Sequence, residues 1–244
     1  MATLLIVASA AAKAAQFQFG VLVQAGIAGA GDWEIGVGTT SAAPVNTASL
    51  ANQWVNGADR AVQMEYLKGT NTVNVRVYNG ATTTGAFTQA SYNPTGGGLV
   101  GANAIWTLPT ASFFATATSG TLFGTSITVS NLTLSGVSGA INIIQPIQQT
   151  TLDASRGFLG ATDTVSQSQN IVFTADSSGS WRLTGTINMT GLPPTLLGAT
   201  GNQLALSVGA SAVDAVPEPG TFGFMLLGAG LIFGARFQKA RAGY

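Results

Sequence analysis

The chain contains neither cysteine nor histidine among its 244 residues. These absences exclude thiol catalysis, Cys–His zinc sites and a Ser-His-Asp triad, and they remove the disulfides that would indicate a compartment. Charged residues are also scarce, with nine Lys and Arg against nine Asp and Glu and therefore no net charge. Phosphate binding requires clustered basic residues, and none cluster before Arg236. Nucleic acid is thus excluded as a partner.

The residues that replace the missing charges favour strands. An average soluble domain has about a quarter of its residues charged, whereas this chain has 7%. Its 32 glycines and its many Ala, Thr, Ser and Asn residues leave hydroxyl, amide and backbone groups to form the surface. Exposed helix faces usually need Glu, Lys and Arg, so the composition predicts a protein of strands and turns.

Short alternating runs of apolar and polar residues recur between residues 15 and 215. The run "TVNVRVYN" places Val73, Val75 and Val77 on one face of a strand. Similar runs are "GDWEIGVG", "AVQMEYL", "AIWTLPT", "NIVFTAD" and "SWRLTGTINMTGL". Turn sequences such as Asn79-Gly80 separate them.

One longer run, "SITVSNLTLSGV", changes its periodicity. Ile127 and Val129 occupy odd positions, whereas Leu132 and Leu134 occupy even ones. A strand keeps its apolar side chains on one face through such a change only if it contains an extra residue. The run therefore predicts a strand with a bulge or a register change.

The spacing of these runs indicates a fold class. About eight to ten short strands without a helical period between the two ends predict an antiparallel β-sandwich or jelly roll. No internal repeat supports a propeller or solenoid. A single domain over residues 15–215 is the simpler interpretation, and residues 94–101 form either a long loop or a domain boundary.

The first residues, "MATLLIVASAAAKAAQFQF", are typical of a signal peptide. Residues 4–12 are apolar, and Ala12-Lys13-Ala14 offers small residues at Ala12 and Ala14 for cleavage before Ala15. Residues 1–14 are therefore expected to be removed on export. The alternative is an ordinary first strand or buried helix.

The other end of the chain predicts a short transmembrane helix. Residues 221–235 are apolar or small throughout and are followed by Arg236, Lys239 and Arg241. The segment is shorter than the roughly 20 residues of a usual span, but snorkelling basic side chains suit it to a thin membrane. The basic residues should keep this end cytoplasmic and leave the preceding residues outside. The alternative, a buried C-terminal helix, is disfavoured by the glycines of the segment.

The sequence "VPEPGT" precedes this apolar segment, and the basic tail follows it. In this order the three parts resemble the PEP-CTERM sorting signal of exported Gram-negative surface proteins. The resemblance implies that Pro217, Glu218 and Pro219 are read by an exosortase, a membrane cysteine transpeptidase. It also implies that Arg236 begins the basic stop. Two prolines hold the chain extended, which would present Glu218 at the membrane face. The sorting signal thus spans residues 216–244.

The body of the chain is similar to the "choice-of-anchor" ectodomains that often precede such signals. The likeness rests on "DWEIGVG", on "NQWVNGADRAVQMEYLKGTNTVNVRVYNG" and on the strand-rich remainder. This resemblance implies a β-sandwich and supplies no catalytic residues.

Two kinds of site are considered in the body. A sugar-stacking platform would use the tryptophans Trp33, Trp54, Trp106 and Trp181, although their apolar or alternating contexts favour core positions. Glycan hydrolysis would use Asp32 and Glu34, which share one face of an extended strand, with Glu65 joining them. Turn and surface roles are favoured for these carboxylates.

We expect no cofactor, since no calcium loop pattern occurs, although structural calcium remains an alternative. The leading hypothesis is a non-enzymatic exported protein of the cell surface or extracellular matrix. Its partners would be an exosortase, the membrane through its C-terminal segment, and exopolysaccharide or copies of itself, because low charge removes repulsion between copies. The alternatives are a secreted carbohydrate-binding module and a glycan hydrolase.

Overall fold

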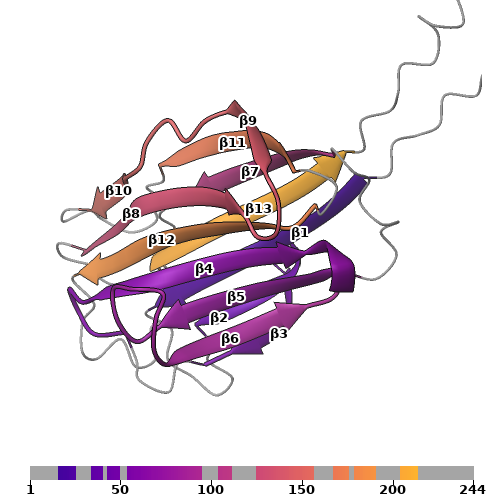
Figure 1. Cartoon of the computed structure of the whole chain (residues 1–244). Helices are drawn as coiled ribbons and strands as arrows, with labels where there is room; N and C mark the ends of the chain where they lie inside the picture. Colours follow the sequence, from indigo (N-terminus) through magenta and orange to yellow (C-terminus); the bar gives the residue numbers. More distant parts are fainter. Residues whose placement is uncertain are drawn as a thin grey trace, which may run out of the picture. The chain divides into compact units, whose positions relative to one another are not determined.

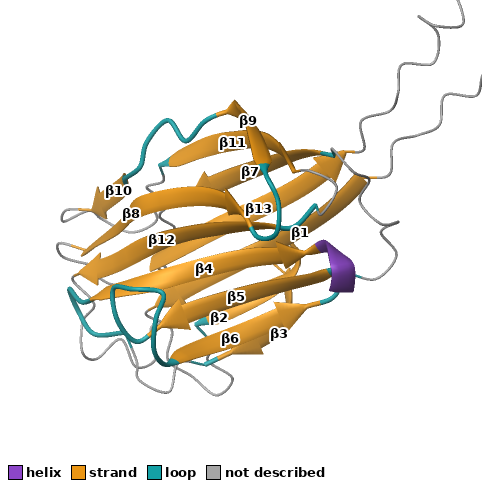
Figure 2. Cartoon of the chain, viewed as in Figure 1, coloured by secondary structure: helices purple, strands orange, loops and turns teal. Residues whose placement is uncertain are grey.

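The computed structural model describes residues 16–25, 34–40, 43–49, 54–94, 104–111, 125–156, 167–175, 179–190 and 204–213. Within these ranges the chain forms strands and one short 3₁₀ turn, η1 (Lys68–Thr70). Figure 2 shows the strands arranged in two layers. The expected antiparallel β-sandwich is therefore confirmed, with thirteen strands in the described part rather than the smaller number predicted.

The first layer is a seven-stranded sheet, and the first and last strands of the sandwich are neighbours in the middle of it. Its order is β3 (Ala43–Ala48), β2 (Ile35–Thr40), β1 (Gln16–Ala25), β13 (Leu204–Val213), β7 (Ile105–Ala111), β11 (Ser168–Ala175) and β9 (Ile141–Gln145). All its strand pairs are antiparallel. The first and last strands, β1 and β13, pair along their whole length.

The second layer is a six-stranded antiparallel sheet (Figure 1). Its order is β10 (Leu152–Arg156), β8 (Thr125–Gly136), β12 (Trp181–Thr190), β4 (Asp59–Leu67), β5 (Thr72–Tyr78) and β6 (Phe87–Tyr92). The turn η1 connects β4 to β5, and the loop 79–86 connects β5 to β6. Because β5 lies between these connections, η1 and this loop lie at opposite ends of the sheet.

The alternation in the sequence sets the inward faces of these strands. In β5, Val73, Val75 and Val77 are fully buried, as their spacing predicts. Their neighbours Asn74 and Arg76 point to the other face of the sheet, because successive residues of a strand alternate between faces.

The bulge predicted in residues 126–137 is present in β8. Thr184 of β12 opposes Thr133, and Thr186 opposes Ser130, so two residues of β8 face the single Gly185. The extra residue, Asn131, has a φ of 54°. A Cβ on Gly185 would lie 3.1 Å from the Leu132 side chain, so glycine lets the bulged strand approach closely. The bulge keeps the apolar residues on both sides of it directed inward.

An aromatic cluster joins the two sheets. Trp106 lies with its ring centroid 4.8 Å from that of Tyr66 and 5.1 Å from that of Trp181. Phe19 and Phe173 stack around this group. All five rings are buried, and they form the part of the core between the sheets that lies nearest to η1 and to the end of β13.

Contacts gather residues Ala15–Asp214 into one compact unit. The predicted signal segment, the apolar C-terminal segment and the sorting motif lie outside the described residues, as do residues 95–101 of the predicted loop or domain boundary. Among the helices that the structure describes, none has the length and apolar character of a membrane span.

Candidate functional surface

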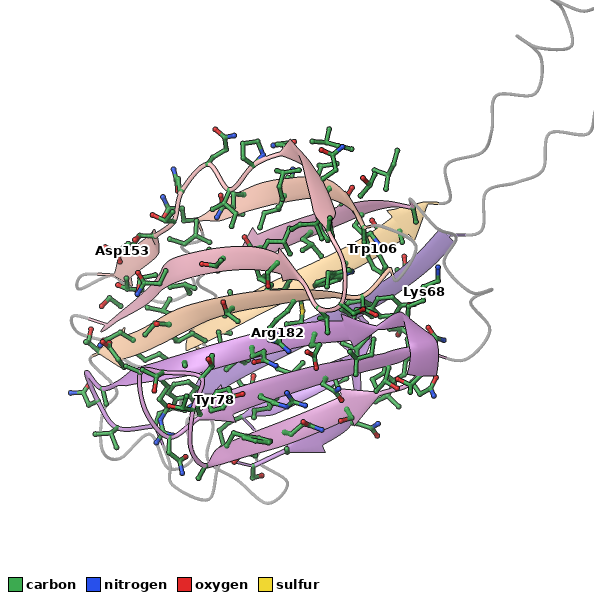
Figure 3. All side chains as sticks on the ribbon, viewed as in Figure 1. Lys68, Tyr78, Trp106, Asp153 and Arg182 are labelled. Carbon is green, nitrogen blue, oxygen red and sulfur yellow. The ribbon has the colours of Figure 1, made fainter. Side chains whose placement is uncertain are left out.

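The outer face of the six-stranded sheet carries an ordered set of polar side chains from four neighbouring strands. We call it the polar face and define it by Glu65, Asn74, Arg76, Phe87, Gln89, Ser91 and Arg182. In the strand register, Arg182, Glu65, Asn74 and Ser91 form one row across β12, β4, β5 and β6. Figure 3 shows Arg182 in the middle of the sheet and Tyr78 at the end of β5 away from η1.

A carboxylate held by two guanidinium groups forms the centre of the polar face. Arg182 donates from Nε and Nη2 to Oε1 of Glu65, at 3.1 and 2.5 Å. Nη1 of Arg76 lies 3.8 Å from the other oxygen, Oε2. The Glu65 side chain is 5% exposed, whereas those of Arg76 and Arg182 are 24% and 38% exposed. Two positive charges thus cover one negative charge and leave a surplus of one positive charge at the surface.

A network of amides and a hydroxyl continues from Arg76 across β5 and β6. Arg76 Nε donates to Oε1 of Gln89 at 2.6 Å, and Gln89 Nε2 donates to the Ser91 hydroxyl at 2.8 Å. The Ser91 hydroxyl donates in turn to Oδ1 of Asn74 at 2.8 Å. Because each side chain positions the next, the polar groups are held in place before any ligand arrives.

An aromatic pair adjoins this network. The rings of Tyr78 and Phe87 lie 5.3 Å apart between centroids, and the Arg76 guanidinium lies 5.2 Å from the Phe87 ring. Tyr78 is buried and donates from its hydroxyl to Gln63 at 3.3 Å. Phe87 is 48% exposed, so the polar face presents an open apolar ring beside charged and amide groups.

The tryptophan platform considered from the sequence is wrong for two of its members. Trp106 and Trp181 are fully buried in the core, where no sugar can stack on them. Trp54 is half-buried, donates its indole N–H to the backbone oxygen of Gln24 at 2.7 Å and packs against the Arg60 guanidinium. Trp33 lies outside the described residues. The interpretation of these tryptophans as core residues is confirmed for the two buried ones.

The carboxylates considered for hydrolysis do not converge in the described part of the chain. Glu65 faces outward from the six-stranded sheet and is held by two arginines, whereas Glu34 directly precedes β2 of the seven-stranded sheet. Asp32 lies outside the described residues. The alternative in which Glu65 joins Glu34 in one site is therefore not supported. Alternation indicates which face of a strand a residue occupies, but it does not indicate to which sheet the strand belongs.

The described residues contain no group of three or more Asp or Glu residues arranged to hold a metal ion. A shallow depression of about 230 Å³ lies on the outer face of the seven-stranded sheet, where Gly20 and Gly209 form part of its lining with Gln18, Thr39, Pro109 and Ser211. These lining side chains offer hydroxyl and amide groups and no acid or base.

Of the residues of the polar face, the sequence singled out Glu65 alone, and for a different role, in glycan hydrolysis. The alternation of "TVNVRVYN" already places Asn74 and Arg76 opposite the buried valines. The turn sequence Asn79-Gly80 indicates that β5 and β6 are neighbours, whereas the register that brings Gln89 and Glu65 beside Arg76 and Asn74 is seen only in the structure. One strand alone therefore predicts two residues of the polar face, but the sequence does not predict how residues from four strands combine to form it.

The first and last described residues lie together at one end of the sandwich. Gln16, which begins β1, pairs with Val213, which ends β13. On its other side Val213 pairs with Ile105 of β7. We call this the terminal end, and η1 lies at the same end of the molecule in Figure 1. The chain continues from here into residues 214–244.

The comparisons with known proteins concern this continuation. A family model described as the PEP-CTERM protein-sorting motif matches residues 215–240. No curated protein matches the chain. The match confirms the resemblance stated for the C-terminal segment and does not extend to the choice-of-anchor likeness of the body, which stays a prediction. The chain therefore carries a PEP-CTERM sorting motif after its β-sandwich, which makes it an exported, cell-surface-associated protein sorted through an exosortase.

Proposed function

We propose that the chain is a non-enzymatic structural protein of the cell surface or extracellular matrix that associates with copies of itself through β9. The observation that carries this proposal is the exposed outer edge of the seven-stranded sheet. In the described part of the chain, β9 pairs with β11 alone, and its residues Ile143 and Ile144 are 39% and 55% exposed. An edge strand with unpaired backbone groups is a template for another strand.

The sequence around β9 lacks the charged side chains that commonly protect an edge, and its one proline, Pro146, follows the strand. Residues 141–151, "INIIQPIQQTT", contain no charged side chain that would repel a second strand. Two copies of β9 can pair antiparallel about a two-fold axis, because each then offers the other the same surface. The opposite edge differs, since Asn46 of β3 donates to the backbone oxygen of Ser91 in β6 and connects the two sheets there.

This assembly is tested by light scattering on the exported protein over a range of concentrations. We expect Ile144→Lys to weaken association, because a charge at the pairing edge must lose its water. The matched control is Val45→Lys, which changes an exposed aliphatic residue of β3 and should leave association unchanged. A monodisperse monomer at high concentration contradicts the proposal.

A second candidate function, saccharide binding, is favoured by the polar face. A sugar ring presents hydroxyl groups at its edge and C–H groups on its face, which match amide and guanidinium donors and an exposed aromatic ring. Phe87, Arg76 and Gln89 supply these groups side by side. The surplus positive charge over Glu65 favours an exopolysaccharide that contains uronates.

Binding of a soluble uronate polymer and of a neutral glucan, measured by titration, tests this second function. We expect Phe87→Ala to weaken binding of both polymers, and we expect added salt to weaken the uronate polymer more. Val55→Ala is the control, because Val55 is similarly exposed but lies outside the polar face. Equal binding by the two variants would eliminate the polar face as the site.

A further inference from the structure

We infer that the terminal end of the sandwich is the surface that meets the membrane-bound processing enzyme, and that the folded sandwich restricts access to the sorting motif. The inference rests on the sorting role of residues 215–240. It goes beyond that role because it assigns a docking orientation and a dependence on folding to this chain. It is independent of self-association and of saccharide binding.

The strand that leads into the motif, β13, is the fourth of seven strands in its sheet and lies between β1 and β7. Its final residue, Val213, is paired on both sides, with Gln16 and with Ile105. Detaching the end of β13 would therefore break its hydrogen bonds to two neighbouring strands. Extending the connection to the motif in this way would cost free energy.

The connection between β13 and the motif is short, since only residues 214–216 separate Val213 from Pro217. Even fully extended, the four Cα-to-Cα steps from Val213 to Pro217 span at most about 14 Å. Three strands lie on each side of β13, which is a lateral distance of about 14 Å to either edge of the sheet. Residues 214–216 can therefore carry Pro217 no farther from Val213 than about the lateral distance from β13 to either edge of its sheet.

An enzyme that reads Pro217, Glu218 and Pro219 must then approach the terminal end directly. Processing thus brings Gln16, Ile105 and Val213 toward the membrane. The loop 79–86 lies at the other end of the six-stranded sheet from η1, and Phe87 follows it. The exposed ring of the polar face is consequently held on the side away from the processing enzyme.

The test measures the rate at which the full-length chain loses its C-terminal segment in a bacterium that has an exosortase, by pulse labelling and intact mass. A flexible Gly-Ser insertion of about ten residues after Ala215 extends the connection. We expect this variant to be processed several-fold faster than the unaltered chain. Deleting Asp214 and Ala215 should slow processing by a similar factor.

Two further variants show whether the folded body is the cause. The same insertion between Thr82 and Thr83, in the loop at the other end, should leave the rate unchanged. Trp106→Ala, which removes a large, fully buried ring of the core, should unfold much of the body and abolish the dependence on spacer length. A spacer effect that persists with the unfolded body would overturn the inference, because it would then come from local recognition of the sequence.

The outcomes separate this inference from the sorting role. If every variant is processed at the same rate, the sandwich does not restrict the enzyme and the inference is wrong, while sorting stands. If no variant is processed at all, both the sorting role and the inference are overturned. Faster processing that requires both the insertion after Ala215 and a folded body supports the inference.

Discussion

The ring of Tyr66 belongs to the buried aromatic cluster, and its hydroxyl donates to Asn71 at 3.2 Å. Burial raises the pKa of Tyr66 from 10.0 to about 12, because the charged phenolate would lose its water. Between these values the unfolded chain releases its proton while the folded chain retains it. Stability from this residue is therefore complete below pH 10 and is lost as the pH rises toward 12.

We expect the free energy of unfolding to fall by about 2 kcal/mol between these pH values on account of Tyr66. Chemical denaturation at a series of alkaline pH values measures this decline. Tyr66→Phe should lower stability by about 1 kcal/mol at neutral pH through its lost hydrogen bond, and should flatten the alkaline decline. An equally steep decline in Tyr66→Phe would show that other groups cause it.

At the scale of the element, the bulge in β8 depends on Asn131. Its φ of 54° lies in the left-handed region, which Asn and Gly tolerate and β-branched residues do not. We expect Asn131→Val to cost about 1 to 2 kcal/mol, and Asn131→Gly to be nearly neutral. Thermal unfolding measures both variants.

The control for the bulge is Ser135→Val in the same strand. Ser135 is exposed and lies in the regular part of β8 opposite Arg182, so valine should change stability by less than about 0.5 kcal/mol. If Asn131→Val were as harmless as this control, the left-handed conformation would not be required at the bulge.

Individual strands could be predicted where one face is buried and the other exposed, because the sequence then alternates between apolar and polar residues. The change from odd to even apolar positions located the bulge, because a buried face tolerates no slip of one residue. This alternation is weaker in the edge strands. In β9 most residues are exposed, and in β3 Val45 is 61% exposed. These two strands therefore lack the alternation of apolar and polar residues that indicates a buried face. These elements account for part of the underestimate in strand number.

At the scale of the whole molecule, β13 is a central strand supplied by the last residues of the sandwich. We expect a chain of residues 15–214 to fold with an unchanged melting temperature, because contacts gather these residues into one unit. A chain of residues 15–203 lacks β13 and should not fold, since β1 and β7 would both lose a paired neighbour. Circular dichroism and melting curves of the two chains compare them. Cooperative melting of the shorter chain would contradict this assignment.

The candidate surface was predictable only in fragments. Arg182 and Glu65 are 117 positions apart in the chain, and their ion pair exists because β12 and β4 are neighbours. The sequence offered the tryptophans as the aromatic candidates, whereas the exposed ring of the polar face belongs to Phe87. A large aromatic residue in an alternating strand can face either way, and its exposure depends on whether another layer covers it.

The sequence by itself determined that the protein is built of strands, that residues 126–137 contain a bulge or a register change, and that a sorting motif follows the strands. These features are local, since they depend on residue spacing and on a linear sequence motif. Only the tertiary structure decided that Trp106 and Trp181 are buried, that two arginines cover Glu65, and that β13 lies between β1 and β7. Alternation fixes which face a side chain occupies, whereas strand order fixes its neighbours, and strand order follows from packing of the whole chain.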